Sequence, residues 1–175
     1  MEIDKILFGD CRQTLKEFDG KARMCVTSPP YYGLRDYGGE DKQIGQEQTP
    51  EEYIQTLVEV FRSVRDVLTD DGTLWVNIGD SYYNYRPGKG QSYPKQSVSK
   101  TKQDLPQECN KRANKLEGLK EKDLIGIPWM LAFALRADGW YLRQDIIWHK
   151  PNPMPESVRD RCTKSHEYIF LSLIH

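Results

Sequence analysis

The chain has 175 residues, which is the usual length of one domain and enough to bury a substantial core. Its net charge of −1 and its pI of about 6.3 do not by themselves indicate a nucleic-acid or membrane partner. No apolar run approaches the roughly 18 residues of a membrane span, and the four cysteines are too widely spaced for a metal-binding pattern. We therefore expect a cytoplasmic protein with reduced thiols, no metal site and no membrane partner.

Short apolar runs alternate with helical patterns along the chain. Strands are expected at residues 5–10, 22–27, 73–78, 140–150 and 167–173, and helices at residues 12–18, from 50 to about 70 and at 128–137. Thr49 and Glu52 form a capping box at the start of the second helix, and Asp71-Gly72 is expected to end it. The alternation predicts an α/β fold with a parallel-type sheet, whose ligands bind at the carboxyl ends of the strands.

The turn at residues 27–31, Thr-Ser-Pro-Pro-Tyr, follows the second expected strand. Pro29 and Pro30 fix their own φ angles, and Pro29 also holds Ser28 out of the α region, so the chain leaves the sheet along one stiff path. Ser28 offers a hydroxyl acceptor, Pro29 a carbonyl and Tyr31 a flat ring. Two acceptors and a stacking surface suit a planar ring that bears an amino group. A plain proline turn or a proline-rich ligand is the alternative.

Residues 81–122 form a basic polar insertion in this pattern. They contain ten Lys and Arg residues against four Asp and Glu residues, a local charge of +6, and four tyrosines lie among the first basic residues. Phosphate contact with base stacking would explain this composition, and so would a solvated loop. A proline-stiffened segment at residues 150–161 is a second basic candidate. The candidate DNA-binding residues are Arg86, Lys89, Lys150, Arg159 and Arg161.

Five segments follow one another in an order typical of one enzyme family. They are Gly9-Asp10-Cys11, residues 27–38, residues 74–82, residues 145–161 and residues 163–171. Together they resemble the amino-methylating DNA methyltransferases of the permuted, β-type order, the DNA methylase N-4/N-6 family. The resemblance implies a Rossmann-like, S-adenosylmethionine-dependent methyltransferase sheet. Residues 1–175 would be a single partial domain, the catalytic half only, and double-stranded DNA within a restriction-modification system would be the partner.

The resemblance also implies a role for each residue of the turn. Ser28 and the carbonyl of Pro29 would accept the two N–H bonds of an exocyclic amine, Pro30 would complete the catalytic turn, and Tyr31 would stack on a base flipped out of the duplex. The amine could then turn its lone pair toward the methyl group of S-adenosyl-L-methionine. Ser rather than Asp at position 28 favours N4 of cytosine, with N6 of adenine as the alternative. Methylation of RNA or of a protein amide is a third, less favoured interpretation.

Several residues have both a functional and a structural interpretation. Asp10 resembles the family's acidic residue that accepts from the cofactor adenine, and Asp80 is expected to line the cofactor pocket. Each would serve equally well as a helix or turn cap. His166 and Glu167 match the family's His-Glu, but a structural role is preferred for them. Trp148 is expected in the core.

The glycine-rich cofactor turn of the family, of the form D-x-F-x-G-x-G-T, is absent from residues 1–175. Because the permuted order places that turn later, we expect a truncated or partial chain, inactive alone and completed by a C-terminal half or a complementing chain. Ile6, Leu7, Met24 and Val26 would then lack cover. Two functions remain open: a DNA amino-methyltransferase completed in this way, and a non-catalytic remnant that binds nucleic acid.

Overall fold

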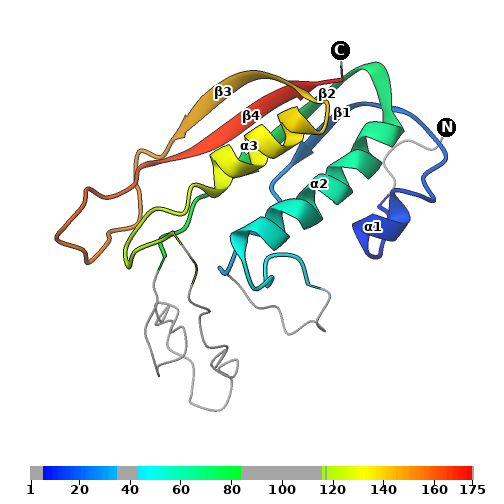
Figure 1. The fold of residues 1–175 in the computed structure, drawn as a ribbon. Helices are drawn as coiled ribbons and strands as arrows, with labels where there is room; N and C mark the ends of the chain where they lie inside the picture. The colour runs from blue at the N-terminus through cyan, green and yellow to red at the C-terminus, as the bar shows by residue number, and fades with distance from the viewer. Residues whose placement is uncertain (1–5, 35–42, 84–115, 117, 175) are drawn as a thin grey trace, which may run out of the picture.

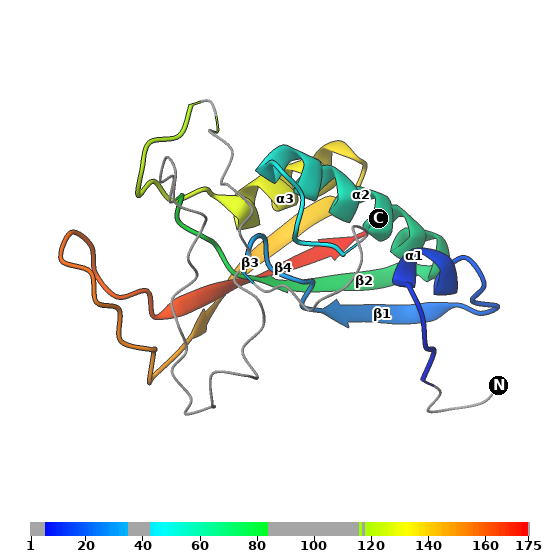
Figure 2. The same cartoon turned by 90° about the horizontal axis from the view of Figure 1, so that it is seen from below.

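The structure is a computed structural model that describes residues 6–34, 43–83, 116 and 118–174. The elements in chain order are α1 (Cys11–Thr14), β1 (Ala22–Thr27), α2 (Pro50–Val67), β2 (Leu68–Ile78), α3 (Ile127–Ala137), β3 (Tyr141–His149) and β4 (His166–Leu173). Figure 1 shows α2 and α3 running roughly along the direction of the strands. In the view of Figure 2 the three helices lie on the same side of the sheet, so the described residues form one helical layer on one sheet.

The four strands form one sheet in the order β1-β2-β4-β3. β1 and β2 are parallel, whereas β4 runs antiparallel to both β2 and β3. The α/β prediction is therefore confirmed, but the predicted parallel-type sheet is a mixed sheet with one parallel and two antiparallel pairs. β3 and β4 are joined by residues 150–165, which contain no helix. Parallel neighbours are usually joined by a crossover helix, whereas β3 and β4 are joined by a loop without one.

The strand expected at residues 5–10 does not form in its described part, residues 6–10. Ile6 and Phe8 are 76% and 88% exposed there. Among the described strands β1 pairs with β2 alone. Residues 6–10 therefore have no neighbouring strand with which their N–H and C=O groups could pair. The helix expected at residues 12–18 is present as the shorter α1.

Helix α2 begins where the capping box predicted. The hydroxyl of Thr49 accepts from the N–H of Glu52 at 3.2 Å, and the Glu52 carboxylate accepts from the N–H of Thr49 at 3.3 Å. Its buried face consists of Pro50, Tyr53, Ile54, Leu57, Val58, Phe61 and Val64. All of these side chains except Pro50 form one core with Leu74, Val76 and Ile78 of β2, Leu131 and Leu135 of α3 and Phe170 of β4. Burial of each large apolar side chain stabilises the fold by about 1.5–3 kcal/mol.

Two expectations are wrong: the position at which α2 ends and the burial of Trp148. Helix α2 ends before Asp71-Gly72, because Leu68 is already extended, 2% exposed and paired with Ala22 of β1. Burial and pairing of Leu68 outweigh the local turn signal, and β2 runs through the glycine. Trp148 is 54% exposed rather than in the core, because it lies on β3 at the edge of the sheet.

The carboxyl ends of β1, β2 and β3 and the start of β4 lie along one edge of the sheet, the edge that crosses the strand ends. The register places Thr27 beside Val76, Ile78 beside Tyr168 and His149 beside His166. The turn at residues 28–31, the end of β2, Lys150 and Glu167 therefore meet at this edge, although they are far apart in the sequence.

The two ends of the basic insertion are held together. Tyr82 forms an isolated antiparallel bridge with Leu124. The N–H of Tyr83 donates to the carbonyl of Asp123 at 2.8 Å, and the N–H of Lys122 donates to the carbonyl of Tyr83 at 2.8 Å. Residues 84–115 and 117 lie outside the described residues, so the role predicted for the insertion stays a prediction. Within the described ranges, no helix is both long and apolar enough to cross a membrane.

Candidate active site

The turn at residues 28–31 leaves the carboxyl end of β1 and is anchored by α2. The hydroxyl of Tyr53 donates to the carbonyl of Pro30 at 2.8 Å, and burial raises the pKa of Tyr53, so this donor keeps its proton. Ser28 is exposed. The carbonyl of Pro29 accepts no hydrogen bond from the described residues. The hydroxyl of Ser28 and the carbonyl of Pro29 are therefore two candidate acceptors on a fixed backbone.

Gly45 packs closely against this turn. Its φ of +96° lies in the left-handed region, and a Cβ there would lie 3.0 Å from the carbonyl oxygen of Tyr31. Its carbonyl accepts from the N–H of Gly33 at 2.8 Å, and its own N–H donates to the carboxylate of Glu47 at 2.8 Å. Only glycine combines this conformation with so close an approach.

The ring of Tyr31 lies against Gly79, just after β2. A Cβ on Gly79 would lie 2.7 Å from Cε2 and 3.1 Å from Cδ2 of that ring. The Tyr31 hydroxyl donates toward Oδ1 of Asn77 at 3.1 Å and Oε2 of Glu167 at 3.2 Å, and it accepts from the hydroxyl of Ser28 at 3.5 Å. Burial is the main reason that the pKa of Tyr31 is raised, so the hydroxyl stays protonated.

Glu167 links Tyr31 to a lysine. One carboxylate oxygen faces Tyr31, and the other forms an ion pair with the ammonium group of Lys150. Burial acts to raise the pKa of Glu167, but hydrogen bonds from Lys150, Tyr31 and Asn77 and the charge of Lys150 outweigh it, so the pKa is lowered. Glu167 is thus an anion at neutral pH.

Asp80 fastens the end of β2 to the start of α3. Its Oδ1 accepts from the N–H groups of Ser81 at 2.9 Å and of Gly126 and Ile127 at 3.0 Å. Its Oδ2 accepts no hydrogen bond from the described residues. Asp80 therefore caps a helix and still has an oxygen that could accept from a ligand.

Asp10 caps α1 and forms an ion pair with Arg12. Its Oδ1 accepts from the N–H of Arg12 at 2.9 Å, and both of its oxygens accept from the Arg12 guanidinium at 2.6–3.0 Å. The hydrogen bond to Asp10 is the main reason that the pKa of Arg12 is raised. A cofactor contact would require Asp10 to share or release Arg12, so the geometry favours Asp80 over Asp10 as an acceptor. The cofactor role of both residues stays a prediction.

Residues 22–172 match the model of the N6/N4 DNA methylase family. The chain belongs to this family. The Type II methyltransferase M.SmaI of Serratia marcescens is 54% identical over 168 residues, which cover 95% of this chain and 54% of that protein. The chain therefore spans about half the length of the curated relatives it matches.

Solved structures of DNA methylases share the fold. The PvuII DNA methyltransferase, which is cytosine-N4-specific, has a TM-score of 0.60 and 15% identity, over 95% of this chain and 48% of that one. A Thermus thermophilus protein assigned as a DNA modification methylase was solved with S-adenosyl-L-methionine. It has a TM-score of 0.58 and 22% identity, over 94% of this chain and 51% of that one. The Rossmann-like methyltransferase fold predicted from the sequence is thus confirmed.

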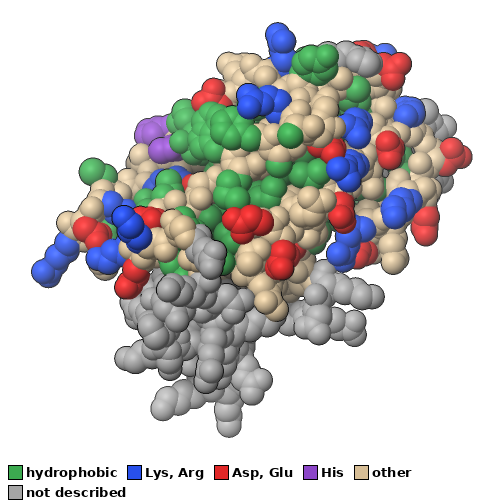
Figure 3. All heavy atoms as spheres, in the orientation of Figure 1, with side chains coloured by type: hydrophobic (Ala, Val, Ile, Leu, Met, Phe, Trp, Pro, Cys, Tyr) green, Lys and Arg blue, Asp and Glu red, His purple; other side chains and the backbone are tan. Residues whose placement is uncertain are grey.

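The loop at residues 150–165 contacts residues at the two ends of the insertion. The guanidinium of Arg161 lies 3.7 Å from the ring centroid of Tyr82 and pairs with Glu156 at 2.7 Å. Lys122 pairs with Asp160 at 2.5 Å. Lys and Arg therefore lie interspersed with Asp and Glu on this loop, at the left of Figure 3.

The five predicted DNA-binding residues have different surroundings. Arg159 is exposed on the loop, whereas Arg161 is held by its neighbours and Lys150 is paired with Glu167. Arg86 and Lys89 lie outside the described residues. Of the three that can be placed, Arg159 is the one whose side chain is most accessible to a phosphate, and DNA contact by all five stays a prediction.

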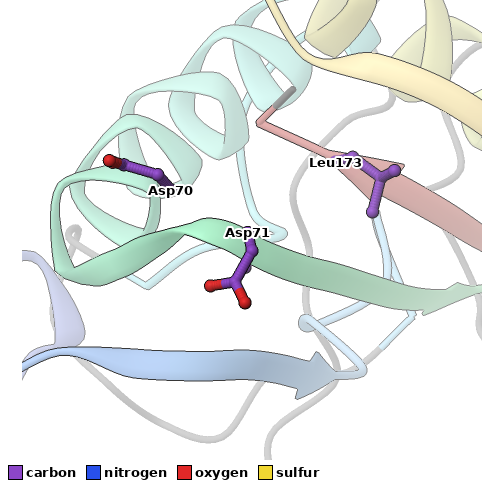
Figure 4. A pocket seen from close by; sticks show the side chains of 4 residues that line it. Asp70, Asp71 and Leu173 are labelled. Carbon is purple, nitrogen blue, oxygen red and sulfur yellow. The ribbon is translucent and has the colours of Figure 1, made fainter.

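A pocket of about 420 Å³ lies at the other end of β2, far from the turn. It is lined by Asp70, Asp71, Gly72 and Leu173, and Figure 4 shows Asp71 and Leu173 pointing to the same side of the sheet. No residue of the turn lines it, so we do not place the active site there. Within the described part of the chain no group of three His, Cys, Asp or Glu residues could hold a metal ion.

Sequence reasoning missed the partners of Tyr31. Asn77 lies in the family segment at residues 74–82 but no role was predicted for it, and a structural role was preferred for Glu167. The signal that could have found them is the alternation of side chains on β2 and β4, which places Asn77 and Glu167 near one another once the antiparallel register is known.

Proposed function

We propose that the chain is the catalytic half of a Type II DNA methyltransferase that transfers a methyl group from S-adenosyl-L-methionine to an exocyclic amine of a flipped base in double-stranded DNA. The observation that carries the proposal is the pair of acceptors on Ser28 and Pro29, fixed beside the ring of Tyr31 in a chain of this family. The relative from Serratia marcescens is a Type II methyltransferase. A cytoplasmic location, where DNA is available, is part of the proposal.

The two acceptors explain how the amine becomes reactive. An exocyclic amine is a poor nucleophile because its lone pair is delocalised into the ring. When Ser28 Oγ and the Pro29 carbonyl accept its two N–H bonds, the nitrogen can pyramidalise and direct the lone pair at the methyl carbon. S-adenosyl-L-methionine supplies this carbon as a sulfonium methyl group. Positive charge would grow on the nitrogen as the C–N bond forms, while the C–S bond breaks and sulfur would leave with the electron pair as the neutral thioether of S-adenosylhomocysteine. Both acceptors would therefore bind the transition state more tightly than the ground state. One N–H proton then leaves to solvent.

We propose N4 of cytosine as the favoured target. A neutral hydroxyl stands at position 28, where an aspartate would favour N6 of adenine. The test is to treat duplex DNA with the natural protein that contains residues 1–175 and S-adenosyl-L-methionine, and to analyse the nucleosides by mass spectrometry. N4-methylcytosine is expected. N6-methyladenine alone would contradict the base assignment, and no methylated nucleoside would contradict the enzyme assignment.

Removal of the Ser28 hydroxyl tests the catalytic role directly. In the natural protein, Ser28→Ala should lower kcat by about 10²–10³, the usual effect of losing one transition-state hydrogen bond. Thr56→Ala, which removes a hydroxyl from α2, is the matched control and should retain wild-type kcat. Wild-type turnover in Ser28→Ala would remove this residue from the mechanism.

We propose that residues 1–175 alone bind the cofactor weakly and do not methylate DNA. Asp80 Oδ2 is an available acceptor, but the sequence has no glycine-rich turn to hold the methionine end. The dissociation constant should be millimolar or weaker, about 4 kcal/mol less favourable than a micromolar site. Calorimetry on the isolated chain measures it. A micromolar constant would mean that other residues build the cofactor site.

A further inference from the structure

We propose that Glu167, with Lys150 as its counter-ion, is a positioning residue that acts through Tyr31 on the hydroxyl of Ser28. The inference deepens the proposed methyl transfer and rests on it. It concerns a residue that does not touch the substrate: Glu167 is on β4, whereas the acceptors are on the turn after β1.

The first step of the argument is convergence. Tyr31, Asn77, Lys150 and Glu167 come from four different segments, and the side chains of all four are partly buried at one edge of the sheet. The Tyr31 hydroxyl lies 3.1 Å from Asn77 and 3.2 Å from Glu167, so it has two acceptors for one proton. That proton is therefore directed into the sheet and away from the outer side of the turn.

The second step is charge. The Glu167 side chain is 20% exposed, and each of its oxygens has a partner, Lys150 on one side and Tyr31 on the other. A hydrogen bond to an ionised carboxylate is roughly twice as strong as one between neutral groups. The ion pair with Lys150 keeps the carboxylate charged and fixed, so Glu167 holds the Tyr31 hydroxyl more firmly than a neutral acceptor would.

The third step leads to Ser28. Because the Tyr31 proton is committed to Glu167 and Asn77, its oxygen lone pair accepts from the hydroxyl of Ser28, at 3.5 Å. A serine hydroxyl has one proton and two lone pairs. With the proton turned toward Tyr31, the lone pairs remain for the amine of the base, which is the orientation that the proposed mechanism requires.

Three variants of the natural protein test the inference by steady-state methylation of duplex DNA. Glu167→Leu removes the acceptor and the charge, Glu167→Gln keeps an acceptor without the charge, and Tyr31→Phe removes the hydroxyl. We expect kcat to fall about tenfold in Glu167→Leu and in Tyr31→Phe, with partial recovery in Glu167→Gln and with little change in KM for DNA. The double variant Tyr31→Phe/Glu167→Leu should be no slower than Tyr31→Phe, because both changes break the same chain of hydrogen bonds.

A structural control separates positioning from stability. Asp138 on the helical layer also pairs with basic residues, Arg62 at 2.5 Å and Arg65 at 3.7 Å, and its side chain is 9% exposed. Asp138→Asn should lower Tm and leave kcat unchanged. Wild-type kcat in Glu167→Leu, multiplicative losses in the double variant, or losses of kcat that follow Tm in all variants including Asp138→Asn would each overturn the inference. A wild-type protein without any methylation would overturn the proposed function itself.

Discussion

Gly79 controls where the ring of Tyr31 can lie. In Gly79→Ala the new Cβ would lie 2.7 Å from a ring carbon, so the ring must move. If the ring stacks on the flipped base, the natural protein carrying this change should bind a duplex with a flipped target base more weakly, by roughly 1–3 kcal/mol. The fluorescence of a base analogue at the target position measures this binding.

Gly20→Ala is the matched control for this prediction. Its Cβ would lie 3.1 Å from the ring of Phe18, a side chain that is 40% exposed and can move. Base binding in Gly20→Ala should equal that of the wild type. Equal binding in Gly79→Ala would show that the position of the Tyr31 ring does not matter for stacking.

At the scale of residues, the sequence predicted the groups that are contiguous and missed those that the fold assembles. The stiffness of the turn at residues 28–31 follows from its two prolines. The hydrogen bonds of Tyr31 to Asn77 and Glu167 depend on the order β1-β2-β4-β3 and on an antiparallel register, neither of which local patterns determine.

At the scale of elements, the loop at residues 150–165 contains two arginines with different surroundings. Arg159 is exposed, whereas Arg161 stacks on Tyr82 and pairs with Glu156. If Arg159 contacts a phosphate, Arg159→Ala should weaken DNA binding by the natural protein equally for all sequences. It should also lower the slope of log K against log salt by about one.

Dissociation constants measured over a range of salt concentrations check this. Arg62→Ala removes one positive charge from α2 and should leave the slope unchanged. A salt dependence identical to the wild type in Arg159→Ala would exclude a phosphate contact at this residue.

Features with a local signal were predicted better than features that depend on tertiary contacts. The capping box and the apolar face of α2 are local signals, and they placed its start correctly. A strand needs a partner, and residues 6–10 have none among the described strands. The end of α2 was misplaced because burial of Leu68 is a tertiary effect that a turn signal does not contain.

At the scale of the whole molecule, Glu167 should make stability depend on pH. Its pKa is lowered from the usual 4.5, so the unfolded chain binds a proton more readily than the folded one. The contribution to the free energy of unfolding is complete above 4.5 and is lost as the pH falls through the folded pKa. Denaturant titrations between about pH 5 and pH 3 should show a steeper loss in the wild type than in Glu167→Gln. Parallel curves for the two proteins would contradict this assignment.

Four apolar side chains in β1 and in the segment before α1 are exposed to solvent, as expected from the sequence. Ile6, Leu7, Met24 and Val26 are 76%, 47%, 56% and 73% exposed. β1, at the edge of the sheet, has pairing groups that the described strands do not use. An exposed apolar edge favours association with another strand or another chain.

The bridge between Tyr82 and Leu124 has a consequence for the length that the insertion can have. Tyr82 follows β2 and Leu124 precedes α3, so the bridge brings the two ends of the insertion together beside these elements. Doubling the length of such a loop costs only about 0.6 kcal/mol in closure entropy. A change in the number of residues between Tyr82 and Leu124 should therefore affect the packing of β2 and α3 little.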